Sequence, residues 1–75
     1  TEKARGLAVI GRQYGKAGNK QQADRLFSQA LKYARSFAPE LQNYPLAYIT
    51  IEYAAANRFT EALQLANRIK DQDSK

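Results

Sequence analysis

The sequence repeats itself at a spacing of 39 residues, and this property constrains the fold more than any other. Leu7, Ile10 and Tyr14 recur at this offset as Leu46, Ile49 and Tyr53. Small and apolar positions recur in the same way, namely Ala8, Ala17, Ala23 and Leu26 as Ala47, Ala56, Ala62 and Leu65. A fixed period of roughly 20 to 50 residues indicates supersecondary units that bury apolar faces against one another. The sequence therefore predicts two similar units stacked in one domain.

The composition is that of a small folded domain without covalent or metal reinforcement. Hydrophobic residues make up 44% of the 75 residues and charged residues 25%, as in globular proteins. The chain contains no Cys and no His, so disulfides and the usual transition-metal ligands are absent. We expect no cofactor and no metal, and we expect stability to come from the core.

The positive charge is concentrated in the first half of the chain. Residues 1–38 contain eight Lys or Arg and two Asp or Glu, whereas residues 39–75 contain four against five. The two halves therefore carry formal charges of +6 and −1. A basic surface attracts acidic peptides, nucleic acids and anionic lipids alike, so charge does not by itself select a partner.

Apolar spacing and turn residues predict four helices. The first helix is expected to end near Gly18, and Asn19 is expected to cap the second helix. Pro39 marks the break after helix two, and helix three is expected from about Pro45 to Ala56. Asn57 then provides a second left-handed turn before helix four. Unit one covers about 4–38, unit two about 44–71, and 72–75 form a polar tail of the single domain 1–75.

Two further features concern how the helices stack. Helix two is apolar over a wide arc, which predicts that it packs on both helix one and helix three. At the 39-residue offset its apolar end, Leu31, Tyr33 and Ala34, becomes Lys70, Gln72 and Asp73. We therefore expect helix four to present a polar outer face that closes the array.

The residues of unit one resemble the tetratricopeptide repeat, a family of helical hairpins. Its pattern positions are occupied by Leu7, Ile10, Gly11, Tyr14, Gly18, Ala23, Phe27 and Ala30. In unit two the matching residues are Leu46, Ile49, Tyr53, Asn57, Phe59, Glu61, Ala62 and Ile69, while Thr50 replaces the Gly and Ala66 the Phe. The resemblance implies an all-α fold of two stacked antiparallel hairpins in a right-handed α-solenoid fragment. The period of 39 departs from the family's period of about 34, which puts the superhelical geometry in doubt.

A related family offers an alternative. The run Tyr14-Gly15-Lys16-Ala17-Gly18 is also similar to the pentatricopeptide repeat, which reads single-stranded RNA. Against this reading, unit two keeps neither this turn sequence nor the positive charge.

The tetratricopeptide resemblance implies a partner-binding groove lined by helices one and three. Helix one contributes Arg5, Arg12 and Lys16, which share a helical face. Helix three contributes Tyr44, Tyr48, Ile51 and Ala55. These residues would suit a peptide carrying acidic and apolar side chains, with Tyr48 as an anchor. Alternatively, the aromatic residues pack against helix one or a neighbouring chain.

No catalytic constellation is evident. Without His or Cys, a nucleophile and base would have to come from other residues, and Glu52 and Glu61 are expected to be isolated and to face water. No apolar run of about 18 residues is present, so no membrane span is expected. A non-catalytic cytoplasmic interaction module is therefore predicted. Thr1 in place of an initiating Met favours a processed product or a piece of a longer chain, and the outer side of helix one could be covered by upstream repeats or by a second copy.

Overall fold

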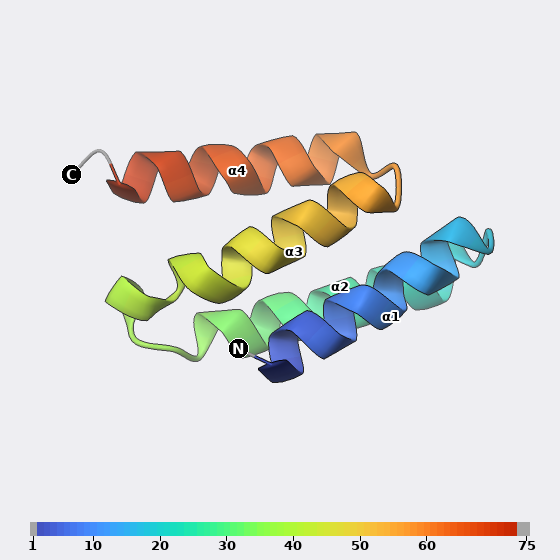
Figure 1. Cartoon of the computed structure of the whole chain (residues 1–75), viewed down its shortest axis with the longest axis horizontal. Coiled ribbons are helices and arrows are strands. Elements are labelled where there is room, and N and C mark those ends of the chain that lie inside the picture. Colours follow the sequence, from blue (N-terminus) through green and yellow to red (C-terminus); the bar gives the residue numbers. More distant parts are fainter. Residues whose placement is uncertain (1, 74–75) are drawn as a thin grey trace.

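The computed structural model describes residues 2–73, and side-chain surroundings for residues 2–69. It contains α1 (Glu2–Lys16), α2 (Lys20–Arg35), a 3-10 turn η1 (Pro39–Leu41), α3 (Asn43–Ala55) and α4 (Phe59–Asp73). No strand occurs in this part of the chain. The prediction of an all-α fold with four helices is confirmed (Figure 1).

The two tight turns form as the sequence predicted, and they share one hydrogen-bond pattern. Gly18 has a φ of 84° and Asn57 a φ of 64°, both in the left-handed region. The amide N of Asn19 donates to the Tyr14 carbonyl at 2.9 Å, and the amide N of Arg58 donates to the Tyr53 carbonyl at 2.9 Å. The Asn19 side chain accepts a hydrogen bond from the Gln22 amide at 3.3 Å, as expected for a helix cap. Each turn therefore reverses the chain directly into the next helix.

The start of α3 differs from the prediction by two residues. The helix begins at Asn43, so that Pro45 is its third residue and is buried. Proline is tolerated there because the first-turn N–H groups have no acceptor within the helix. The preceding connection is held by the Gln42 side chain, which donates to the Phe37 carbonyl at 2.8 Å.

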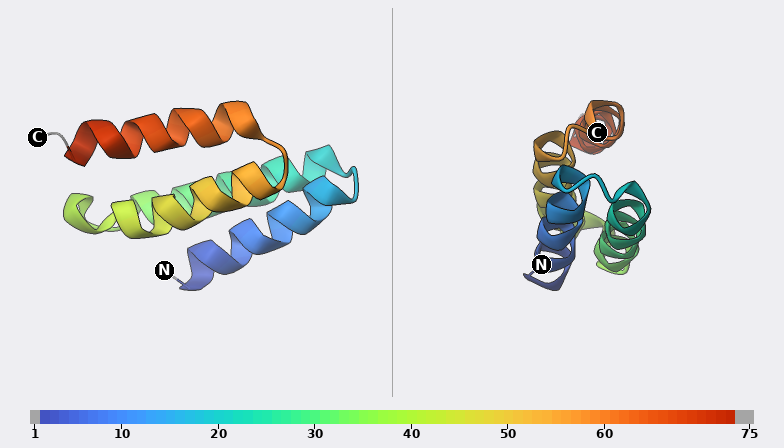
Figure 2. Two further views of the ribbon diagram at one scale, coloured as in Figure 1. Left: turned by 45° about the horizontal axis from the view of Figure 1, so that its top comes forward. Right: turned by 90° about the vertical axis from the view of Figure 1, so that its right-hand side faces the viewer.

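The helices form two antiparallel hairpins whose axes lie side by side. In Figure 1, α1 and α3 lie in front and α2 lies behind them. The helix α4 runs along the side of α3 that points away from α1, and the end-on view in Figure 2 agrees. As the wide apolar arc of α2 predicted, this helix contacts both α1 and α3. The helices α1 and α3 also contact each other directly, and this places the two faces of the predicted groove side by side.

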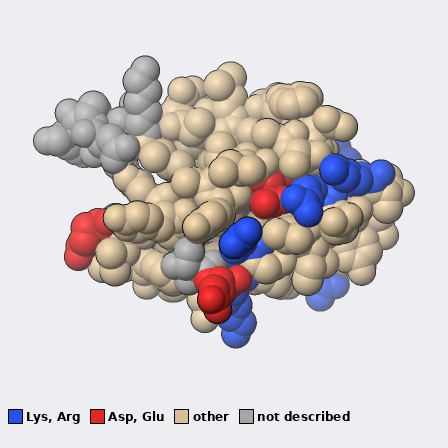
Figure 3. All heavy atoms as spheres, in the orientation of Figure 1, with Lys and Arg blue, Asp and Glu red and all other residues tan. Residues whose placement is uncertain are grey.

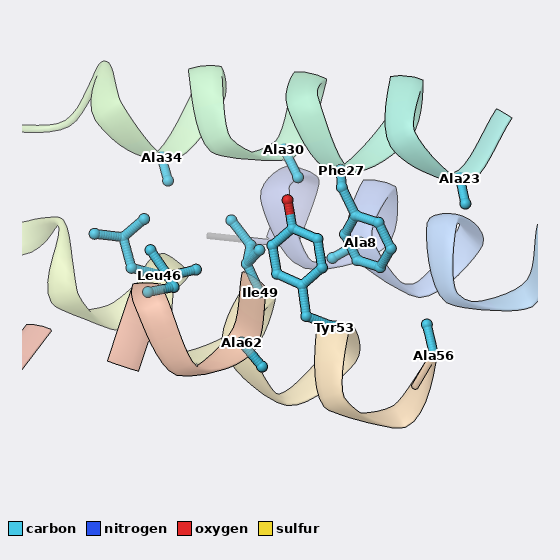
Figure 4. Close-up of a cluster of buried hydrophobic side chains, with 11 residues drawn as sticks. Ala8, Ala23, Phe27, Ala30, Ala34, Leu46, Ile49, Tyr53, Ala56 and Ala62 are labelled. Carbon is cyan, nitrogen blue, oxygen red and sulfur yellow. The ribbon is translucent and has the colours of Figure 1, made fainter. Parts of the chain in front are cut away.

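The core is built from a few large side chains surrounded by alanines. Phe27 and Ile49 are fully buried, and the rings of Phe27 and Tyr53 stack at a centroid distance of 4.1 Å (Figure 4). A Cβ added at Gly11 would lie 3.4 Å from the Phe27 ring, so the absence of a side chain there allows α1 to approach α2 closely. The side chains of Lys70, Gln72 and Asp73, on which the predicted polar closing face depends, lie outside the described residues.

Candidate functional site

The most unusual surface is one face of α3. Tyr44, Tyr48, Ile51 and Ala55 follow one another at steps of four, three and four residues and therefore share a face of the helix. Tyr44 is 66% exposed and Ile51 60% exposed, while Tyr48 is partly exposed and Ala55 half-buried. The opposite side of α3 is also apolar, with Leu46, Ile49 and Tyr53 in the core. A helix that is apolar on all sides is normally covered on all sides, whereas α3 is covered on about half of its circumference.

One side chain of α1 lies against this exposed face of α3, which we call the α3 strip. The guanidinium carbon of Arg5 lies 5.2 Å from the ring centroid of Tyr48, within the range of a cation–π contact. Lys16, in the last turn of α1, is exposed. Of these two cations, Arg5 is the one in contact with the α3 strip.

Arg12 occupies a different environment from the other two cations. Its guanidinium Nη1 donates to Oε1 of Glu52 at 2.8 Å, forming an ion pair between α1 and α3. Glu52 is buried, so the prediction that Glu52 is isolated and faces water is wrong. A carboxylate that entered this interface without a cation would lose its hydration without compensation, and the pairing with Arg12 supplies that compensation. The charge of Arg12 is therefore largely matched within the chain.

Glu61 is also paired, contrary to the prediction. Its Oε2 lies 3.7 Å from Nη1 of Arg58, and Arg58 forms a second ion pair with Asp24 of α2. Arg58 thus ties the turn between α3 and α4 to the start of α2. Sequence reasoning missed the Arg58–Asp24 pair because its partners lie 34 residues apart, whereas Arg58 and Glu61 have the local i,i+3 spacing that could have been recognised.

Figure 3 shows the face on which α1 and α3 lie in front. Basic and acidic side chains are mixed along α1 and its border with α3, whereas the surface over α3 and α4 shows few charges. The basic half of the sequence therefore does not produce a uniformly positive surface on this side. Its charge is interrupted by acidic partners.

A concave region lies between α2 and α4 and was not predicted. This cleft of about 380 Å³ is lined by Leu31, Arg35, Tyr53, Glu61, Gln64, Leu65 and Arg68. Burial raises the pKa of the Tyr53 hydroxyl above its ordinary value of 10.0; nearby Glu61 raises it further and Arg35 lowers it. The lining mixes apolar positions of the core, such as Tyr53 and Leu65, with polar positions of α2 and α4. No signal in the sequence marks them as a group.

Other site classes find little support among the described residues. The part of the chain that the structure describes holds no cluster of three or more acidic residues placed to bind a metal ion. None of its helices combines the length and the apolar character needed to cross a lipid bilayer. In comparisons with known proteins, no family model, no curated protein and no solved structure matched this chain.

Proposed function

We propose that this chain is a non-catalytic interaction module of the tetratricopeptide-like class, with its two hairpins forming a right-handed α-solenoid fragment. It binds a peptide or a partner protein on the groove lined by α1 and α3. The observation that carries the proposal is the half-covered α3, whose exposed face presents Tyr44, Tyr48 and Ile51. Tyrosines on a rigid helix provide large contact area at a low cost in side-chain entropy, and they are enriched among residues that dominate binding energy.

The chemistry of the groove favours a partner with both apolar and acidic side chains. Tyr44 and Ile51 supply apolar contact area, while Arg5 and the exposed Lys16 of α1 supply positive charge. Arg5 already lies over the Tyr48 ring, so an acidic side chain could bind the guanidinium while the rest of the segment covers the tyrosine. Arg12 contributes less, because Glu52 neutralises it.

Binding of synthetic peptides tests the proposal. The probe is a fluorescent peptide library that alternates Asp or Glu with Leu, Phe or Trp, measured by anisotropy against the wild-type chain. Tyr48→Ala should weaken the best peptide by at least about tenfold, as expected for an aromatic anchor. Gln29→Ala, at an exposed position of α2, should leave binding unchanged. The absence of any peptide binding, or equal binding by Tyr48→Ala, would contradict the proposal.

A salt series separates this function from binding of single-stranded RNA. An oligouridine probe should bind weakly and lose its affinity as salt rises, because generic attraction to Lys and Arg is screened. Peptide binding that depends on Tyr48 should persist at the same salt concentration. Salt-resistant RNA binding would favour the pentatricopeptide-like alternative instead.

A further inference from the structure

Three side chains with the same sequence pattern differ in burial between the two hairpins. In α3, Leu46, Ile49 and Tyr53 are buried where this helix docks on α1 and α2. Their equivalents in α1, at the 39-residue offset, are Leu7, Ile10 and Tyr14. Ile49 is 0% exposed whereas Ile10 is 50% exposed. Leu7 is partly buried against the core, whereas Ile10 and Tyr14 are exposed. These α1 side chains, which we call the head surface, thus have the apolar character of a docking face that is left largely uncovered.

The second hairpin carries the counterpart of the surface on which α3 docks. In the first hairpin, a Cβ at Gly15 would lie 3.2 Å from Ala56, and Phe27 stacks on Tyr53. At the 39-residue offset, Gly15 and Phe27 correspond to Ala54 and Ala66. With the neighbouring small and apolar positions of α3 and α4, they define a tail surface of Ala47, Ala54, Phe59, Leu63 and Ala66.

The tail surface is open to a further helix. Phe59 and Leu63 are each 64% exposed, and with Ala66 they form one stripe along α4. Glu61, Gln64 and Arg68 line the cleft shared with α2, on the opposite side of α4. The stripe therefore faces away from α2.

We propose that two copies of this chain associate head to tail. The α1 helix of one copy packs its head surface on the tail surface of another, as α3 packs on α1 and α2 within one chain. The residues that differ between the two hairpins at the 39-residue offset suit this contact. Ala66 leaves room for Tyr14 of the other copy. Leu63, which stands at the position equivalent to Asp24, adds apolar contact. Gln13 and Ile51 replace the Glu52 and Arg12 ion pair. That ion pair accordingly has no counterpart at the junction between copies.

The charge distribution favours this polarity over symmetric pairing. The first half of the chain carries +6 and the second half −1, so contact between two heads brings two strongly positive halves together. Head-to-tail contact avoids this repulsion and gives a weak attraction. Because the two contacting surfaces differ, such an interface leaves a free head and a free tail and can continue to larger assemblies.

A mixing experiment with two charge variants of the whole chain tests the proposal. Ile10→Glu blocks the head and Leu63→Glu blocks the tail, and both positions are at least half exposed, so circular dichroism should show folded helices. Gln64→Glu, on the cleft side of α4 opposite the stripe, is the control with the same charge change as Leu63→Glu. Mass is measured by sedimentation equilibrium over a concentration series.

The wild-type chain and Gln64→Glu should gain mass beyond a dimer as concentration rises. Each blocked variant alone should associate at least about tenfold more weakly, because a buried unpaired carboxylate opposes the contact. An equal mixture of the two should form dimers that do not grow, since it holds one intact head and one intact tail. A symmetric interface would give no such rescue.

A wild-type chain that stays monomeric, or a mixture that fails to dimerise, overturns the proposal and leaves the two surfaces to other segments or partners. Tyr48→Ala should not alter self-association, so this result is independent of peptide binding.

Discussion

Removing Arg12 should destabilise the fold far more than removing any ordinary surface arginine. The Arg12 guanidinium lies 2.8 Å from Glu52, whose exposure is 8%, so Arg12→Met leaves a buried carboxylate without its cation. Breaking a buried pair in this way costs about 3–5 kcal/mol. The Arg12 side chain is 26% exposed, which admits some water to the site, so we expect about 3 kcal/mol, at the lower end.

This loss is large against the stability of such a small domain. At roughly 0.05–0.15 kcal/mol per residue, the whole chain has about 4–11 kcal/mol of unfolding free energy. Urea denaturation followed by circular dichroism measures the difference, and thermal melting should show a fall in Tm of about 15 °C. Arg25→Met, the same substitution at an exposed site in α2, should change the free energy of unfolding by less than about 0.5 kcal/mol.

A double variant keeps the reasoning testable if Arg12→Met is poorly folded. Arg12→Met combined with Glu52→Leu removes both charges, so no uncompensated carboxylate remains and most of the lost stability should return. A single variant within about 1 kcal/mol of wild type, or a double variant no more stable than the single one, would refute the argument that burial of Glu52 requires Arg12.

Two further predictions concern a turn and a buried hydroxyl. Gly18→Ala should lower the unfolding free energy by about 1 kcal/mol, because Gly18 has a φ of 84°. Gly6→Ala, in open space within α1, should raise the unfolding free energy by about 0.5–1 kcal/mol. Urea denaturation measures both variants, and an unchanged stability of Gly18→Ala would contradict the prediction. Burial raises the pKa of Tyr53 in the folded state, so above pH 10.0 the unfolded chain loses this proton first and the unfolding free energy falls as pH rises. Urea denaturation at pH 9 and pH 11 should show that Tyr53→Phe reduces this fall and that Tyr44→Phe, at an exposed tyrosine, does not; equal falls in both variants would show the shift to be negligible.

The local structure could be predicted well from the sequence. The turns at Gly18 and Asn57, the cap at Asn19 and the break at Pro39 depend on residues a few positions apart, whose backbone preferences act in any tertiary context. The start of α3 was misplaced by two residues because proline is accepted at several positions of a first helical turn.

The candidate site could be predicted in part. Tyr44, Tyr48 and Ile51 were grouped by helical spacing, and the structure places them on one exposed face. Spacing does not show which charges are already neutralised, so Arg12 was grouped with Arg5 and Lys16 although it pairs with Glu52. No pattern in the sequence marks the cleft between α2 and α4, because the cleft forms between two helices that are not adjacent in the sequence.

The sequence by itself determined that the chain forms four helices joined by two tight turns and which face of each helix is apolar, because backbone preference and hydrophobic periodicity act over a few residues. The tertiary structure decided which apolar faces are covered and which charges are paired. Leu46 is buried and Leu7 only partly so, and Glu52 meets Arg12 across 40 residues, because burial and pairing depend on where two helices cross in space. The same sequence pattern thus gives a core surface in α3 and an open one in α1.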